Sequence, residues 1–208
     1  VSKHKKTKRR KMKNIYKLFT IGVLSLLFIS TTNAQSETTE YLSLGNKIEF
    51  NGENFELKWS SHPSNEYYKQ EYLRKDDKLP KYEKMLMVEA VKGNIPAKNV
   101  VAGKINELEN LKKRNPVVNY EKFENTEKNE IILDFIMSDG KSTYEWNIYR
   151  YQNQSNESGD YLVLYSYSYR NYISNEKDKR KFLSEIKKMK KDLVKKVGEI
   201  ELPNVKTK

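Results

Sequence analysis

The chain has 208 residues, a formal net charge of +12 at pH 7 and no cysteine. The absence of cysteine excludes disulfides and a lipid-modified cysteine anchor, so the core must stabilise the fold without covalent cross-links. The charge is concentrated at the front, because residues 1–34 contain nine Lys and Arg and no acid, which leaves 31 basic and 28 acidic residues in the rest of the chain. The high pI therefore does not indicate nucleic-acid binding, and nucleic acid is not expected as a partner.

Residues 1–34 have the pattern of a signal peptide with an extended basic n-region. An apolar run from Leu18 to Ile29 follows the basic residues, and Thr32 and Ala34 then occupy the small-residue positions of a cleavage site. We expect cleavage between Ala34 and Gln35 and export to the periplasm or the extracellular space. The alternative is a membrane anchor formed by the uncleaved signal helix, but the apolar run is shorter than the about 20 residues that a bilayer span needs.

Behind this leader we expect a flexible mature N-terminus over residues 35–45, one domain over residues 46–202 and a C-terminal tail over residues 203–208. A domain of this length is large enough to bury a hydrophobic core of its own.

Alternation of apolar and polar residues predicts an antiparallel sheet of about six to seven strands. Asn51-Gly52 and Asp139-Gly140 favour hairpin turns, whereas His62-Pro63-Ser64 is expected to end a strand and residues 153–159 to form a loop. The candidate strands are residues 47–50, 55–60, 67–73 (as an edge strand), 82–91, 117–123, 130–137, 144–152 and 161–170.

Two amphipathic helices are predicted to cover this sheet. The first begins at Ile95-Pro96, because proline fits the first helical turn, and ends at Arg114-Asn115-Pro116. The second spans Glu176 to Val197, with an apolar residue at every third or fourth position. Strands followed by a helix, twice over and with short connections, predict a single α+β domain.

The ends of the second helix carry recognisable signals. Ser174 or Asn175 is expected to cap its N-terminus, and Gly198 is expected to end it.

His62 is the one histidine after the leader, and Ser60, Ser61 and Ser64 lie beside it. A histidine base next to a serine is the arrangement of many nucleophilic hydrolases, so an envelope hydrolase using His62 or paired carboxylates is one alternative function. No Gly-x-Ser-x-Gly segment is present, and histidine before proline in a serine-rich stretch is typical of turns. We therefore predict no catalytic residue and favour a protein that is not an enzyme.

Cofactor and metal chemistry lack sequence support. A zinc site usually takes three or four Cys, His or carboxylate ligands, and one histidine without cysteine does not supply the common spacings. No glycine-rich phosphate loop lies between a strand and a helix. We predict no metal and no cofactor.

Asp134 is the carboxylate that most needs an explanation, because it shares a strand face with Ile132 and Ile136. If that face is buried, Asp134 needs a partner or its pKa rises. We favour an outward-facing Asp134 or one paired with a lysine or arginine.

Tyrosine is the strongest positive signal, with 15 residues in the chain. In residues 161–170, every second residue from Tyr161 to Tyr169 lies on one face of the predicted strand. Such a face suits either core packing or a half-exposed binding surface, because tyrosine is apolar with a polar tip. The predicted binding surface consists of Trp59, His62, Tyr67, Tyr68, Tyr165, Tyr167 and Tyr169.

The second helix has ten Lys and Arg against four acids between Glu176 and Val197. A basic helix with an apolar side can lie on an anionic membrane, whereas the simpler interpretation docks its apolar side on the sheet. A membrane contact would use Lys187, Lys188, Lys190 and Lys191.

The sequence as a whole predicts an exported, non-enzymatic domain that binds a partner protein or a small ligand through an aromatic-rich sheet surface. The two alternatives are an envelope hydrolase and a peripheral protein held at a membrane surface by the basic C-terminal helix.

Overall fold

The computed structural model describes residues 38–202 and 204–206. The predicted leader and its cleavage site at Ala34 and Gln35 lie outside these residues. The elements in chain order are β1 (Lys47–Phe50), β2 (Glu53–Ser64), β3 (Tyr67–Leu73), β4 (Lys84–Lys92), α2 (Ala97–Lys112), β5 (Asn119–Asn125), β6 (Glu130–Ser138), β7 (Thr143–Asn156), β8 (Gly159–Tyr172) and α3 (Glu176–Glu199).

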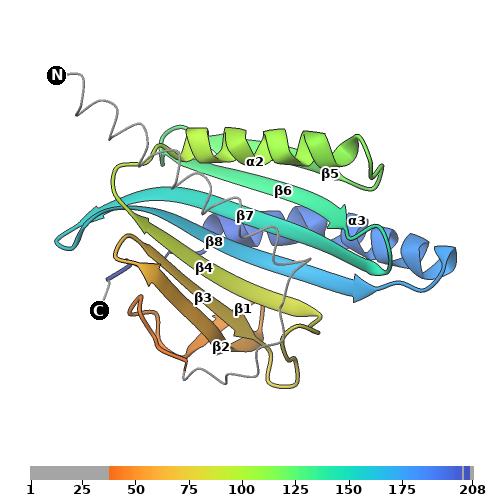
Figure 1. Ribbon diagram of the computed structural model, residues 1–208, viewed down its shortest axis with the longest axis horizontal. Helices are drawn as coiled ribbons and strands as arrows, with labels where there is room; N and C mark the ends of the chain where they lie inside the picture. Colours follow the sequence, from red (N-terminus) through yellow and green to blue (C-terminus); the bar gives the residue numbers. More distant parts are fainter. Residues whose placement is uncertain (1–37, 203, 207–208) are drawn as a thin grey trace.

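All eight described strands form one antiparallel sheet in the order β1-β2-β3-β4-β8-β7-β6-β5. The first four strands and the last four are each a meander, and β4 pairs with β8 to join them (Figure 1). The α+β class with one antiparallel sheet is confirmed. The sheet has eight strands rather than six to seven, because residues 67–73 and 119–125 both form strands. β3 is moreover an interior strand between β2 and β4, not an edge.

Two predicted breaks in the sheet are wrong. β2 continues through His62 and Pro63 to Ser64, and its pairing with β3 is irregular between Ser61 and Ser64. Such an irregularity tolerates proline, which cannot donate a ladder hydrogen bond. Residues 153–159 are mostly strand as well, since β7 and β8 pair as far as Asn156 and Gly159.

The two described helices cover opposite faces of the sheet, as Figure 1 shows. We call them the α2 face and the α3 face. On the α3 face, α3 contacts β6, β7 and β8, and its buried residues are Phe182, Ile186, Leu193 and Val197. The apolar side of this helix is thus docked on the sheet, as the simpler interpretation of its sequence predicts.

The ends of α3 match the prediction only in part. The Asn175 side chain accepts a hydrogen bond of 2.9 Å from the backbone N–H of Asp178 and caps the helix, as expected. Gly198 does not end the helix, which runs to Glu199. A β-carbon at Gly198 would lie 3.1 Å from Cδ1 of Ile132, so a tight approach to the sheet favours glycine here.

On the α2 face, α2 contacts β5, β6 and β7. The helix spans Ala97 to Lys112, close to the prediction, and its buried residues include Val101 and Leu108 at the expected spacing. Lys104 is also buried in this stripe, although it is charged.

The segments at both ends of the described chain pack on the α3 face. Leu42 lies within residues 35–45, for which the sequence predicts flexibility, yet its side chain is fully buried, and so is Val205 in the predicted tail. The backbone N–H of Lys206 donates to the carbonyl oxygen of Leu42 at 3.3 Å, so the two segments are bonded to each other.

Among the described helices, none has the length and apolar character that a membrane crossing requires.

The docking of α3 predicts unequal effects at two neighbouring residues. Phe182 is fully buried, with its ring centroid 5.2 Å from that of Tyr169, whereas the side chain of Leu183 is exposed. We expect Phe182→Ala to lower the free energy of unfolding by about 3–5 kcal/mol, because it removes a buried ring and leaves a cavity. Leu183→Ala is the matched control and should cost less than about 1 kcal/mol. Urea denaturation measures both, and equal losses would contradict the described docking.

Candidate functional site

The predicted aromatic binding surface is not one surface in the structure. Trp59 is paired with Glu71 on the α2 face, where Tyr67 also lies. Tyr68, Tyr165, Tyr167 and Tyr169 belong to the core of the α3 face. Residues that follow one another in a strand point to opposite faces, which separates Tyr67 from Tyr68.

The three tyrosines of β8 are core residues in the structure. Tyr167 lies beside Phe50 and Trp146, with ring centroids 5.3 and 6.5 Å apart, and Tyr169 lies beside Phe182 of α3. Each of the three is at most 9% exposed, so they belong to the core of the α3 face, and Tyr169 contacts α3 directly.

His62 has structural contacts. Its ring stacks on Tyr68 with centroids 4.1 Å apart and planes 11° from parallel. Its Nδ1 lies 3.1 Å from the carbonyl oxygen of Tyr67, which can only accept, so Nδ1 carries the proton in this hydrogen bond. The hydroxyl of Ser60 accepts a hydrogen bond from the backbone N–H of Thr39. Neither of these contacts joins His62 to Ser60.

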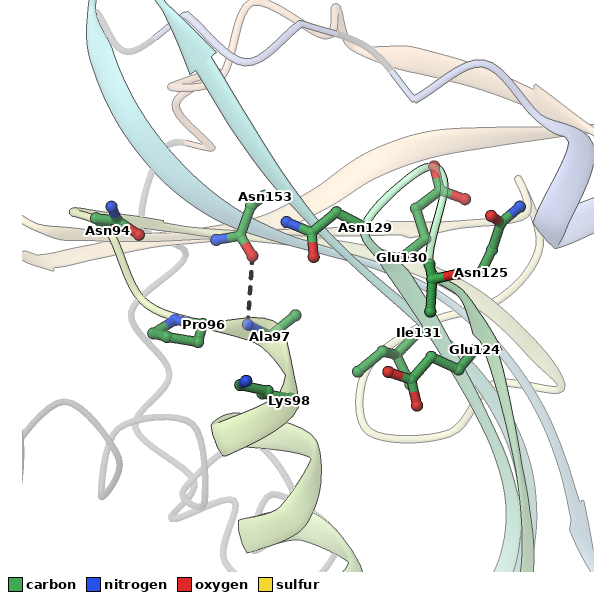
Figure 2. A pocket seen from close by; sticks show the side chains of 11 residues that line it. Asn94, Pro96, Ala97, Lys98, Glu124, Asn125, Asn129, Glu130, Ile131 and Asn153 are labelled. Atoms are coloured by element: carbon green, nitrogen blue, oxygen red, sulfur yellow. Dashed lines mark hydrogen bonds between the residues drawn. The ribbon is translucent and has the colours of Figure 1, made fainter.

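A pocket of about 440 Å³ lies where the N-terminus of α2 approaches the turn between β5 and β6 (Figure 2). We call it the asparagine pocket, because four of its lining residues are asparagines. Its wall is formed by Asn94, Pro96, Ala97, Lys98, Glu124, Asn125, Thr126, Asn129, Glu130, Ile131 and Asn153. These residues come from four separate segments of the chain, so only the folded domain forms the pocket.

Asn153 of β7 fixes the helical side of the pocket. Its Oδ1 accepts a hydrogen bond of 3.3 Å from the backbone N–H of Ala97, and its Nδ2 donates to the carbonyl oxygen of Ile95 at 2.7 Å. Pro96 occupies the N-cap position of α2 and makes no side-chain cap. A side chain of strand β7 therefore accepts a hydrogen bond from a backbone N–H that has no partner within the helix. Figure 2 shows the Asn153–Ala97 contact at the pocket wall.

The opposite side of the pocket is the turn that joins β5 to β6. Oδ1 of Asn125 accepts a hydrogen bond from the backbone N–H of Lys128, and Asn129 has a left-handed φ of 52°. Asparagine tolerates this conformation better than most residues. The carboxylate of Glu130 is already occupied, since its Oε1 accepts hydrogen bonds of 2.6 Å from both Arg150 and Gln152.

The chemistry of the asparagine pocket is polar and close to neutral. Asn94 and Asn129 each offer a carbonyl acceptor and an N–H₂ donor, a combination that matches hydroxyl and amide groups of a ligand, whereas Asn153 is bonded to the start of α2 through both of its amide groups. Lys98 and Glu124 add one charge of each sign. No lining residue is aromatic. The sequence reasoning missed this pocket, because Asn153 was assigned to a loop and Asn129 to a region between strands.

A second cluster of polar residues is buried on the α2 face, and we call it the charge layer. Lys69 of β3 lies 2.8 Å from Glu71 and 3.7 Å from Glu89 of the neighbouring strand β4. Burial lowers the pKa of Lys69, but the two carboxylates outweigh it and hold that pKa above its ordinary value. Burial also raises the pKa of Glu89, and the attraction of Lys69 opposes this rise.

Lys104 extends the charge layer from α2. Its Nζ lies 5.1 Å from the ring centroid of Phe135 and 5.8 Å from that of Tyr149, and 3.5 Å from a carboxylate oxygen of Glu107. Burial lowers the pKa of Lys104 to about 8, against the attraction of Glu107. Lys104 is the charged residue within the otherwise apolar stripe of α2, and this position is the signal from which the sequence could have identified it.

Glu145, Arg170 and Tyr82 complete the charge layer. Nε of Arg170 donates to Glu145 at 2.6 Å, and the hydroxyl of Tyr82 donates to the same carboxylate oxygen at 2.7 Å. The guanidinium of Arg170 lies 3.9 Å above the ring of Tyr82. The charge of Glu145 is thus paired with Arg170, whose guanidinium also stacks on the aromatic ring.

Asp134 is buried on the α3 face and has two partners. Lys190 of α3 lies 2.6 Å from its Oδ2, and Nε1 of Trp146 donates to its Oδ1 at 2.9 Å. Asp134 is thus paired with a lysine, one of the two arrangements that we favoured. The pairing also engages Lys190, whereas Lys187, Lys188 and Lys191 remain exposed.

Among the described residues, no group of three or more His, Asp and Glu side chains is placed to hold a metal ion.

The low pKa of Lys104 predicts a pH dependence of stability. The unfolded chain keeps the lysine proton up to pH of about 10.5, whereas the folded chain releases it near pH 8, so folding becomes more favourable as the pH rises between these values. From pH 7 to pH 9 we expect a gain of about 1 kcal/mol that Lys104→Met lacks. Lys98→Met is the control, because Lys98 is exposed on the same helix.

Urea denaturation of the three proteins at pH 7 and pH 9 measures this contribution. The same pH dependence in wild type and Lys104→Met would contradict a lowered pKa at Lys104.

One protein-family model matches residues 42–202 of the chain. No curated protein and no solved structure matches the chain.

Proposed function

The chain belongs to the family whose model spans residues 42–202, and we propose that it is an exported, non-enzymatic domain that binds a small neutral ligand in the asparagine pocket. The ligand would carry several hydroxyl or amide groups, as a short saccharide does. A partner protein that presents hydroxyl or amide groups at its surface would be bound by the same kind of hydrogen bond.

The observation that carries this proposal is the convergence of amide side chains on one half-open cavity. A volume of about 440 Å³ lies in the range of small-molecule sites. Asn153 is held by two hydrogen bonds to the start of α2, so this wall is formed before a ligand arrives. A preformed site loses less conformational entropy on binding than a flexible one.

Neutrality of the ligand follows from the charges around the pocket. Lys98 and Glu124 balance each other, and the carboxylate of Glu130 is neutralised by Arg150 at 2.6 Å. A charged ligand would therefore meet no opposite net charge to offset the loss of its hydration. Neutral hydroxyl and amide groups find donors and acceptors in the amides of the wall.

The hydrolase alternative gains no support from the contacts of His62, whose Nδ1 is bonded to the carbonyl oxygen of Tyr67. The alternative of a membrane-surface protein rests on the exposed Lys187, Lys188 and Lys191. It lacks an apolar helix side to insert, because the buried residues of α3 face the sheet.

Export is proposed on the leader sequence. We expect the mature protein to begin at Gln35, because Thr32 and Ala34 fit the cleavage site. Mass spectrometry of the protein recovered from the cell envelope or the medium would measure its N-terminus. An intact leader on protein recovered from the cytosol would contradict export.

Ligand binding is tested with two lining substitutions. Ligand-observed NMR first identifies a saccharide that binds the protein. We expect Asn94→Ala and Asn129→Gly each to weaken the binding of this saccharide about 2- to 10-fold, because each variant loses one hydrogen bond to the ligand. Glycine at residue 129 keeps the left-handed φ, so the turn is preserved. Titration by calorimetry gives the dissociation constants.

Asn106→Ala is the matched control, because Asn106 is an exposed asparagine of α2 that does not line the pocket. Its dissociation constant should equal that of the wild type. If no neutral saccharide or amide in a broad panel binds the folded protein at millimolar concentration, or if Asn106→Ala weakens binding as much as the lining variants, the proposed site is wrong.

A further inference from the structure

The strand β5 is an edge of the sheet. In the described part of the chain it pairs only with β6, so one side of its backbone has no neighbouring strand. It is seven residues long, regularly paired and largely exposed. Edge strands of this kind pair readily with another strand unless their side chains prevent it.

The side chains of β5 include an exposed aromatic residue. Phe123 is 42% exposed, and Tyr172 and Leu183 are the other exposed large hydrophobic residues of the described chain. Phe123 is the one of these that lies on an edge strand. An exposed phenylalanine on an unpaired edge adds apolar area to any pairing with another strand.

The charges of β5 alternate in sign around Phe123. Lys122 and Glu124 precede and follow it, point to the same face of the sheet and lie 3.0 Å apart, and both are more than 40% exposed. Charged residues protect many edges from pairing, but that protection depends on like charges meeting. In β5 the charges of Lys122 and Glu124 are opposite in sign, and the two residues lie directly before and after Phe123.

This symmetry makes β5 complementary to a second copy of itself. When two β5 strands run antiparallel with Phe123 opposite Phe123, Lys122 of each copy lies opposite Glu124 of the other, which gives two ion pairs. Opposite residues of paired strands point to the same face, and a register centred on Glu124 would place the two glutamates opposite each other. A register centred on Lys122 would place the two lysines opposite each other.

We propose that the protein forms a symmetric dimer through β5, in the register centred on Phe123. The two eight-stranded sheets join into one, with two cross-strand ion pairs on the α2 face and two phenylalanines in contact on the α3 face. The occupant of the edge is a second copy of this chain, and the complementary charges of Lys122 and Glu124 are the reason for this choice.

The same register places Tyr120 of the second copy opposite Thr126 and its Glu121 opposite Asn125. Thr126 and Asn125 line the asparagine pocket, so each copy would border the pocket of the other. Dimer formation through β5 requires no ligand in the asparagine pocket, so it can be measured with the protein alone.

Sedimentation equilibrium of the purified protein tests the dimer. The contact consists of two short strands, so we expect weak association, with dimer present at about 100 µM and monomer dominant at about 1 µM. Phe123→Glu should remove the dimer at 100 µM, because it places two carboxylates opposite each other. Leu183→Glu, which changes an exposed residue of α3, should leave association unchanged.

A charge exchange makes the test specific for the register. Lys122→Glu alone and Glu124→Lys alone should each weaken dimerisation at least about 10-fold, because each creates like-charged pairs. The double variant Lys122→Glu/Glu124→Lys restores opposite charges and should return the dimerisation constant to within about threefold of the wild-type value.

Circular dichroism of each variant confirms that it is folded. A wild-type protein that stays monomeric at 100 µM overturns the proposal, and so does a dimer that Phe123→Glu leaves intact. A double variant as weak as the single variants would overturn the proposed register.

Discussion

The pairing of β4 with β8 is the interaction on which the rest of the structure depends. Nine residue pairs, from Lys84–Tyr169 to Lys92–Tyr161, join two four-stranded meanders that are otherwise local in sequence. Because β8 alternates strictly, this pairing also fixes which side chains each face receives. Its tyrosines build the core beneath α3, and Leu164, Ser166 and Arg170 point to the α2 face. Any slip of one residue would exchange these two sets.

The two faces of the sheet differ in how their buried charged residues are arranged. The α3 face is mainly apolar and aromatic, and two of its buried carboxylates form ion pairs, Asp134 with Lys190 and Glu130 with Arg150. The α2 face combines an apolar core beneath α2 with the charge layer around Lys69, Glu89 and Lys104. Buried charges cost free energy unless they are paired, so the layer contributes less to stability than apolar residues of the same volume would. Its members come from different elements, because Lys69 of β3 lies between Glu71 of the same strand and Glu89 of β4, and Lys104 of α2 lies beside Glu107.

The asparagine pocket and the β5 edge are neighbours because of the same topology. β5 ends the sheet on one side, and the turn after it forms one wall of the pocket while α2 forms the other (Figure 2). Asn153 lies in neither wall's segment, and its side chain bonds the start of α2 to β7. The proposed ligand site and the proposed dimer contact would therefore lie side by side.

The sequence by itself determined the class of fold and most strand and helix positions, and it narrowed the cap of α3 to Ser174 or Asn175, because these follow from local periodicity and from turn and capping residues. It misjudged Pro63 and Gly198, whose roles depend on a sheet irregularity and on the close approach of Ile132. Only the tertiary structure decided which residues form a site. Trp59 and Tyr67 were separated from the tyrosines of β8, and Asn94, Asn129 and Asn153 were brought together, because cross-strand register and helix placement set distances between residues far apart in the chain.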